Sequence, residues 1–146
     1  MTGITKEGIE VDRDFAAAPG AVFDAWTTAQ HFARWFGGKD VEVPAEDLDY
    51  QPTDGGTWAA TMVLPDGNSI RWVGEFIEVV APERFVLTIT DNPQSADRAV
   101  ISVVLSSTGD GTRMRFTQET PGFAPEQREA TIAGWQSFFD ELSAGL

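Results

Sequence analysis

The sequence contains no cysteine and only one histidine, His31. Without cysteine the chain has no disulfide, no thiolate metal ligand and no cysteine nucleophile. The single histidine falls in a surface-like position of a predicted short helix, where a histidine more often faces solvent than takes part in catalysis. The carboxylates of residues 42–49 cluster on one predicted strand edge with no histidine beside them. We therefore expect no metal site, no cofactor and no catalytic residue.

Positive charge is also scarce, because 10 Lys and Arg stand against 23 Asp and Glu and give a formal net charge of −13. Such a charge repels phosphate backbones and anionic lipid surfaces. No apolar run approaches the roughly 18 residues that a membrane-spanning helix needs, and residues 1–10 have no signal-like apolar core. We expect a cytoplasmic protein that binds neither nucleic acid nor membrane.

What the sequence does contain is alternation of apolar and polar residues, interrupted by turn signals. With 146 residues the chain has the length of one ordinary domain, and we expect a single domain over residues 1–146. Period-two alternation predicts strands. The predicted strands cover residues 9–15, 41–50, 57–64, 69–80, 85–89, 101–105 and 114–118. The segment 41–50 is predicted as an edge strand, because Pro44 and several carboxylates interrupt it.

Two short helices are predicted after the first strand. Pro19 opens the first, with Val22, Phe23 and Trp26 on its apolar face, and the second carries Trp35 with Phe32 and Phe36. Helices this short need tertiary packing to form. They should close one end of the sheet, either as the wall of a pocket mouth or simply as core.

The last stretch, 125–146, reads as one long amphipathic helix, and the rest of the chain supplies strands to cover its apolar stripe. The stripe residues follow one another at steps of three or four. They are Ile132, Trp135, Phe138, Phe139, Leu142 and Leu146. The predicted fold is α+β, a curved antiparallel sheet of six to seven strands around the long C-terminal helix. A pocket is expected between sheet and helix.

Polar residues that fall among the inward-facing aromatics indicate a small-molecule site, since such sites are apolar with a few convergent polar groups. The candidate ligand-binding residues are Trp26, Trp35, Trp58, Trp72, Phe76, Phe85, Met114, Phe116, Gln118, Arg128, Thr131, Trp135 and Phe138. Arg128 either pairs with a carboxylate at the start of the helix or holds an anionic or carbonyl-bearing end of the ligand. Arg13 interrupts the inward face of the first strand and is expected to reach the sheet edge or a carboxylate.

Four groups of residues along the chain resemble the signatures of one family. These are Phe15, Ala18, Pro19, Val22, Phe23, Ala25, Trp26, Thr27, Trp35 and Phe36; Gly55, Gly56, Gly74 to Glu78, Pro82, Glu83 and Arg84; Gly111, Thr112 and Arg113; and Gly134, Trp135, Phe139 and Leu142. They span nearly the whole chain and resemble the family named for the activator of the heat-shock-protein-90 ATPase. That family belongs to the START-like (SRPBCC, birch-pollen-allergen-like) superfamily, so the resemblance implies the helix-grip fold with a cavity under the long helix.

Three functions remain open at this point. The inward aromatics favour binding of a small apolar or amphipathic molecule without catalysis, while the resemblance implies a co-chaperone or stress-response protein as the alternative. A polyketide cyclase or hydrolase needs a pair of titratable groups in the cavity. Many relatives of this type have a histidine near the end of the last strand where this chain has Gln118, which counts against acid–base chemistry. The expected partner is therefore a small hydrophobic or amphipathic ligand, with a homodimer and a chaperone left open.

Overall fold

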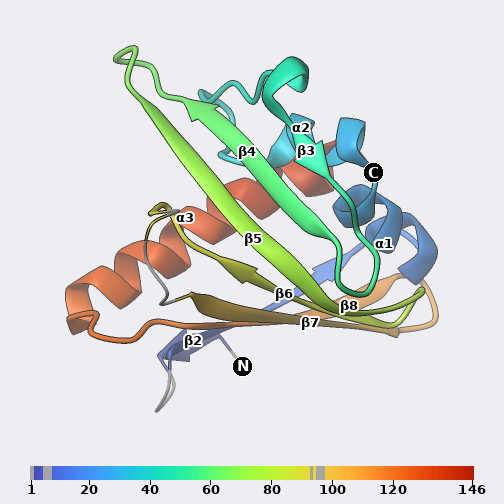
Figure 1. Cartoon of the computed structure of the whole chain (residues 1–146). Helices are drawn as coiled ribbons and strands as arrows, with labels where there is room; N and C mark the ends of the chain where they lie inside the picture. The colour runs from blue at the N-terminus through green and yellow to red at the C-terminus, as the bar shows by residue number, and fades with distance from the viewer. Residues whose placement is uncertain (1, 5–7, 93, 95–97) are drawn as a thin grey trace.

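The computed structural model describes residues 2–4, 8–92, 94 and 98–146 (Figure 1). The strands are β1 Gly3–Ile4, β2 Gly8–Phe15, β3 Asp49–Tyr50, β4 Thr57–Val63, β5 Ser69–Val80, β6 Arg84–Ile89, β7 Ala99–Ser107 and β8 Thr112–Glu119. The helices are α1 Pro19–Thr27, α2 Ala29–Trp35, the short 3-10 helix η1 Ala45–Asp47 and α3 Pro125–Ala144. This order confirms the two short helices after the first long strand and the long helix at the end of the chain.

The strands pair into one antiparallel sheet in the order β1-β2-β8-β7-β6-β5-β4-β3. The long helix α3 lies across the inner face of this sheet, and α1 and α2 lie at one end of it (Figure 1). The predicted α+β class and helix-grip arrangement are confirmed. The described residues contain eight strands rather than six to seven, because the two-residue strand β1 adds to the edge beside β2.

The segment predicted as an edge strand over residues 41–50 is strand only at Asp49–Tyr50. Glu42 makes an isolated bridge to Val63, and the chain then turns through η1 directly after Pro44. Proline lacks the N–H that a strand ladder needs, so the ladder stops at Pro44 and restarts only beyond the turn. The edge strand is therefore much shorter than its sequence pattern predicts.

Strand β5 joins the two halves of the sheet. Its first half pairs with β4 and its second half with β6, and the register shifts between Phe76 and Glu78. At Gly74 the backbone of β6 comes so close that an added Cβ would lie 1.8 Å from the carbonyl oxygen of Thr88 and 2.4 Å from the indole Nε1 of Trp58. That nitrogen donates a hydrogen bond of 2.9 Å to the same carbonyl. Glycine is required here so that β4, β5 and β6 can meet.

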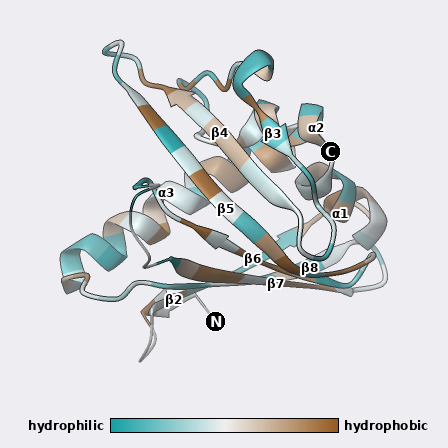
Figure 2. Ribbon diagram, in the orientation of Figure 1, coloured by the Kyte–Doolittle hydropathy of each residue, from teal (hydrophilic) through white to brown (hydrophobic). Residues whose placement is uncertain are grey.

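Helix α3 buries most of its predicted stripe against the sheet. Leu146, predicted as the last residue of the stripe, lies beyond the end of the helix at Ala144 and is 42% exposed. Trp135, Phe139 and Leu142 are buried, whereas Ile132 and Phe138 are half-buried. Pro125 occupies the first turn, and the amide N–H of Ala124 donates to the side chain of Gln127 at 2.7 Å. Figure 2 shows the N-terminal end of α3 as hydrophilic, with hydrophobic stretches on β5 to β7. The apolar contact with the sheet is thus concentrated in the middle and C-terminal turns.

Arg13 on β2 fixes the helix to the sheet edge. Its guanidinium donates to the backbone carbonyl of Gln136 at 3.0 Å, to the side-chain carbonyl of the same residue at 3.1 Å, and to Asp140 at 2.6 Å. The predicted pairing of this inward arginine with a carboxylate is confirmed. Arg13 therefore has a structural role, because it spans the gap between β2 and α3.

The core is an aromatic cluster around Trp26 of α1. The Trp26 ring lies 4.7 Å from that of Trp35, 5.1 Å from that of Phe85 and 6.0 Å from that of Phe139, measured between centroids. The indole of Trp35 donates to the carbonyl of Ala25 at 2.8 Å, which ties α2 to α1. The two short helices are thus mainly core, as one of the two sequence interpretations proposed.

Candidate functional site: a cleft between the sheet and the long helix

A cleft of about 390 Å³ lies where α3 faces β4, β5, the β6–β7 connection and the end of β8. It opens to solvent, since lining residues such as Trp72 and Phe138 are only half-buried. Aromatic and aliphatic side chains form most of its wall. Its lining residues are Phe36, Met62, Trp72, Ile89, Thr90, Asp91, Arg98, Ala99, Gln118, Glu119, Pro121, Phe123, Thr131, Gly134, Trp135 and Phe138. The strands supply one wall and α3 supplies the opposite wall. The rim is formed by Thr90, Asp91, Arg98, Ala99, Glu119, Pro121 and Phe123.

Five of the residues predicted as ligand-binding line this cleft. They are Trp72, Gln118, Thr131, Trp135 and Phe138. Seven others are buried in the core beside the cleft or beyond it, namely Trp26, Trp35, Trp58, Phe76, Phe85, Met114 and Phe116. The five on strands face inward as their alternation predicts, whereas Trp26 and Trp35 lie on helices. Other side chains cover all seven; the ring of Phe116, for example, lies 4.6 Å from that of Trp135. Arg128, the remaining candidate, does not line the cleft.

The cleft also contains residues that the sequence interpretation did not include. Met62 and Ile89 lie on the inward faces of β4 and β6, so their alternation with polar neighbours was a usable signal. Arg98 and Phe123 lie in connections between elements, where no periodicity marks which side chains face a cavity. The rim residues of the cleft could therefore be identified only from the structure.

One polar contact joins the two walls of the cleft. The indole Nε1 of Trp135 on α3 donates a hydrogen bond of 2.7 Å to the side-chain oxygen Oε1 of Gln118 on β8. No further hydrogen bond of the Gln118 side chain is found within the described residues. On α3 the hydroxyl of Thr131 donates to the carbonyl of Gln127 at 2.8 Å. Gln118 and Thr131 are thus held in place at the cleft wall.

The charged side chains among the described lining residues are Asp91, Arg98 and Glu119. Asp91 and Glu119 are exposed, and a carboxylate oxygen of Glu119 accepts the backbone N–H of Val100 at 3.2 Å. Arg98 is half-buried, and its guanidinium has no ion pair within the described residues. Arg128 on α3 is half-buried as a residue, and its Nε atom is fully buried. This atom has no hydrogen-bond partner among the described residues.

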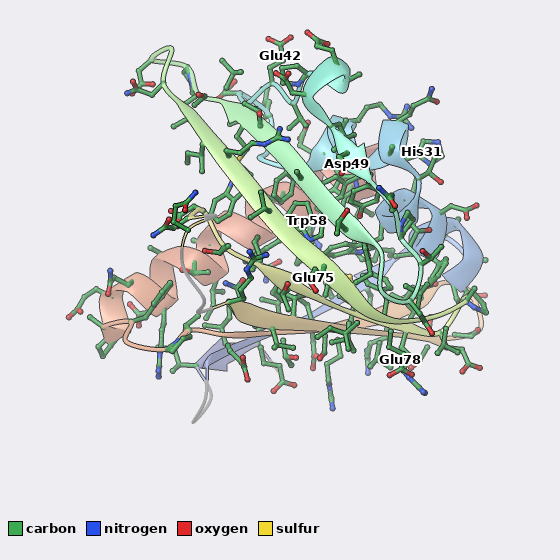
Figure 3. All side chains as sticks on the ribbon, in the orientation of Figure 1. His31, Glu42, Asp49, Trp58, Glu75 and Glu78 are labelled. Carbon is green, nitrogen blue, oxygen red and sulfur yellow. The ribbon has the colours of Figure 1, made fainter. Side chains whose placement is uncertain are left out.

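Among the described residues, the groups whose pKa departs from its ordinary value lie outside the cleft. Burial raises the pKa of Tyr50 well above its ordinary value, and the hydrogen bond from Arg113 lowers the pKa of Asp14, but neither residue lines the cleft. His31 lies on α2, far from Glu42, Glu75 and Glu78 (Figure 3). Among the described residues no group of three or more His, Asp or Glu is arranged to hold a metal ion.

A second hollow of about 260 Å³ lies where α1 and α2 meet the C-terminal turn of α3. His31, Arg34, Asp24 and Glu141 bring charges of both signs to its wall. This hollow is smaller and less apolar than the cleft under α3. In the part of the chain that the structure describes, no helix is long and apolar enough to cross a membrane.

Comparisons with known proteins agree with the fold. A family model described as Activator of Hsp90 ATPase homolog 1-like protein matches residues 16–146. No curated protein matches the chain.

Several solved structures are similar over most of their length. The AHSA1 protein from Silicibacter pomeroyi is 24% identical with a TM-score of 0.81, covering 93% of this chain and 94% of that one. A protein from Staphylococcus epidermidis is 22% identical with a TM-score of 0.83, covering 98% of this chain and 91% of that one. The AHSA1-like protein from Aeromonas hydrophila is 23% identical with a TM-score of 0.74, covering 92% and 90%. At these identities the likeness concerns the fold alone.

Proposed function

The chain belongs to the family of Activator of Hsp90 ATPase homolog 1-like proteins, and from that premise we propose that it binds a small apolar or amphipathic molecule in the cleft under α3. The observation that supports the proposal is the composition of the cleft wall. Aromatic rings of Phe36, Trp72, Trp135 and Phe138 face the same space as a few polar side chains. This combination is typical of small-molecule sites.

The volume of the cleft supports a ligand rather than a few waters. Ligand cavities have volumes of roughly 300 to 1,000 Å³, and the cleft has about 390 Å³. A molecule that fills it would cover the exposed parts of Trp72 and Phe138, which are half-buried in the free protein. Removal of this apolar surface from water would supply most of the binding free energy.

Gly134 on α3 offers a sharp test, since it lines the cleft and faces open space. A Cβ built at this glycine meets no atom within 4 Å. Glycine inside a helix costs roughly 1 kcal/mol relative to alanine, so this position loses helix stability and keeps the cleft open. The substitution Gly134→Leu should therefore fill the cleft without disturbing the fold.

The experiment compares Gly134→Leu with Ala133→Leu, which adds a larger side chain at the neighbouring exposed position of α3. Native mass spectrometry of the freshly purified protein would detect a co-purified molecule. We expect the wild type and Ala133→Leu to carry it and Gly134→Leu to lose it while its thermal stability stays the same or rises. Equal retention by Gly134→Leu would remove the cleft as the binding site.

The support for a chaperone-associated role is the description of the family. A pull-down with the chaperone, run on the wild type and on Gly134→Leu, separates it from ligand binding. Capture of both proteins alike would favour a role of the outer surface, independent of the cleft.

A further inference from the structure

The hydrogen bond from Trp135 fixes the orientation of the Gln118 amide, and this orientation decides which atom of Gln118 is free to contact a ligand. An indole N–H donates hydrogen bonds and never accepts them, so the 2.7 Å contact with Trp135 requires the oxygen of the Gln118 amide to face Trp135. The amide nitrogen Nε2 is then the atom left over, and it has no hydrogen bond within the described residues. Because Gln118 lines the cleft, the wall presents an N–H donor there.

Arg98 brings a second donor to the same cleft. A guanidinium donates hydrogen bonds only and keeps its charge at any ordinary pH. In this strongly acidic chain Arg13, Arg84, Arg113 and Arg115 all have carboxylate partners. Arg98 is half-buried and, like Arg34, Arg71 and Arg128, has no carboxylate partner among the described residues. Of these four arginines only Arg98 lines the cleft.

The acceptors of the cleft are placed differently. The two carboxylates at its rim, Asp91 and Glu119, are exposed, and Glu119 already accepts the N–H of Val100. Thr131 uses its hydroxyl proton on the carbonyl of Gln127. Gln118 Nε2 and the Arg98 guanidinium are therefore donors without a partner among the described residues, whereas the charged acceptors of the cleft are exposed carboxylates. The hydroxyl oxygen of Thr131 can still accept a hydrogen bond.

From this arrangement we infer that the ligand of the proposed site is an amphipathic carboxylic acid, whose ionised end accepts hydrogen bonds from Gln118 Nε2 and the Arg98 guanidinium. Its apolar part lies along Trp72, Trp135 and Phe138. Hydrogen bonds to an ionised partner are the stronger kind, and a half-buried guanidinium gains most from such a partner. This inference deepens the proposed function and rests on it.

The first experiment compares three probes that share one tail and differ only in the polar end: decanoate, decanol and decylammonium. Isothermal titration calorimetry on the wild-type protein at neutral pH measures each affinity, with decanoate ionised. We expect decanoate to bind about tenfold or more tighter than decanol, and decylammonium to bind most weakly. A preference for decylammonium would overturn the inference, because Asp91 and Glu119 would then dominate the site.

The second experiment reverses the polarity of the wall. Gln118→Glu keeps an oxygen for the Trp135 indole but replaces the donor with a second carboxylate oxygen. We expect its affinity for decanoate to fall about tenfold to a hundredfold while its affinity for decanol changes little. The matched control is Gln30→Glu, the same change at an exposed position of α2, which should leave all three affinities as in the wild type.

Arg98→Gln tests the guanidinium separately and does not depend on the fold tolerating a charge at Gln118. It should lower the affinity for decanoate about tenfold and spare that for decanol. Its control is Arg34→Gln, which removes the same charge at an exposed site on α2. A decanoate affinity unchanged in both Gln118→Glu and Arg98→Gln would overturn the inference.

The outcomes also separate the two proposals. If decanol and decanoate bind the wild type equally well and Gly134→Leu abolishes both, the cleft binds amphipathic molecules and the carboxylate inference is wrong. If no probe binds, or if Gly134→Leu leaves binding intact, the proposed function itself fails.

Discussion

The space between the sheet and α3 has a closed end and an open end that are built from the same kinds of side chain. At the closed end, around Trp26, α1 and α2 cover the sheet, and Trp26 is 1% exposed. At the open end, which is the cleft, Trp72 faces inward from β5 in the same way but stays half-buried. The difference arises from the covering elements, since only Phe36 from the α2 region reaches the cleft. The alternation of apolar and polar residues thus decides on which face of the sheet a side chain lies. The elements that pack against that face decide whether the side chain becomes part of the core or of a binding surface.

The largest expected effect comes from the closed end. Trp26→Ala removes the ring that contacts Trp35, Phe85 and Phe139 and should cost about 3 to 5 kcal/mol of unfolding free energy. A denaturant titration measures it. A loss below about 1 kcal/mol would mean that the cluster around Trp26 is loosely packed, and the contrast between the two ends would disappear.

The matching substitution at the open end is Trp72→Ala. Trp72 is half-buried, and its indole donates to the sulfur of Met62 at 3.1 Å, so less packing is lost. We expect a stability loss of roughly 1 to 2 kcal/mol together with weaker ligand binding. The same titration followed by calorimetry with decanoate checks both parts. A loss as large as that of Trp26→Ala, with binding unchanged, would assign Trp72 to the core.

Adding one methyl group in the cleft should increase the stability of the protein, unlike the two tryptophan substitutions. Gly134→Ala places a Cβ in open space inside a helix and should raise the unfolding free energy by about 0.5 to 1 kcal/mol. Ala133→Gly, at the exposed neighbour, is the reciprocal control and should lower it by a similar amount. A destabilised Gly134→Ala would show that the helix is not open toward the cleft at this point.

The smallest effect is expected on the outer face of the sheet. A hydrogen bond from Arg113 at 2.9 Å lowers the pKa of Asp14 below its ordinary 3.8. A lowered pKa in the folded state contributes stability above the unfolded-state pKa, and this contribution is lost as the pH falls through the folded-state pKa. Asp14→Asn should therefore make stability slightly less dependent on pH on the acid side. The effect should be small and should shrink in high salt, because both side chains are well exposed. Thermal melts from neutral to acid pH, at low and high salt, measure it.

Much of the fold could be predicted from the sequence because it depends on periodicity. Alternation placed the long strands, and the three- and four-residue steps of α3 predicted its buried face around Trp135 and Phe139. The segment around Pro44 was less accessible, since its residues alternate like a strand although the proline interrupts the ladder.

The candidate site could be predicted only in part. Trp72, Gln118 and Trp135 face inward and line the cleft, as their periodicity indicated. Phe85 follows the same pattern but is buried, because the pattern says nothing about which helix covers it. Arg98 lies in a connection without periodicity, so its place in the same cleft as Gln118 depends on tertiary structure alone.

We expect ligands to enter the open end and leave the closed end undisturbed. The five tryptophans report on both ends. A decanoate titration of the uniformly ¹⁵N-labelled protein, followed by NMR of the indole N–H signals, tests this expectation most directly. We expect large shifts for Trp72 and Trp135, which line the cleft, and small shifts for the buried Trp26, Trp35 and Trp58. Equal shifts for all five, or shifts confined to Trp26 and Trp35, would contradict this expectation.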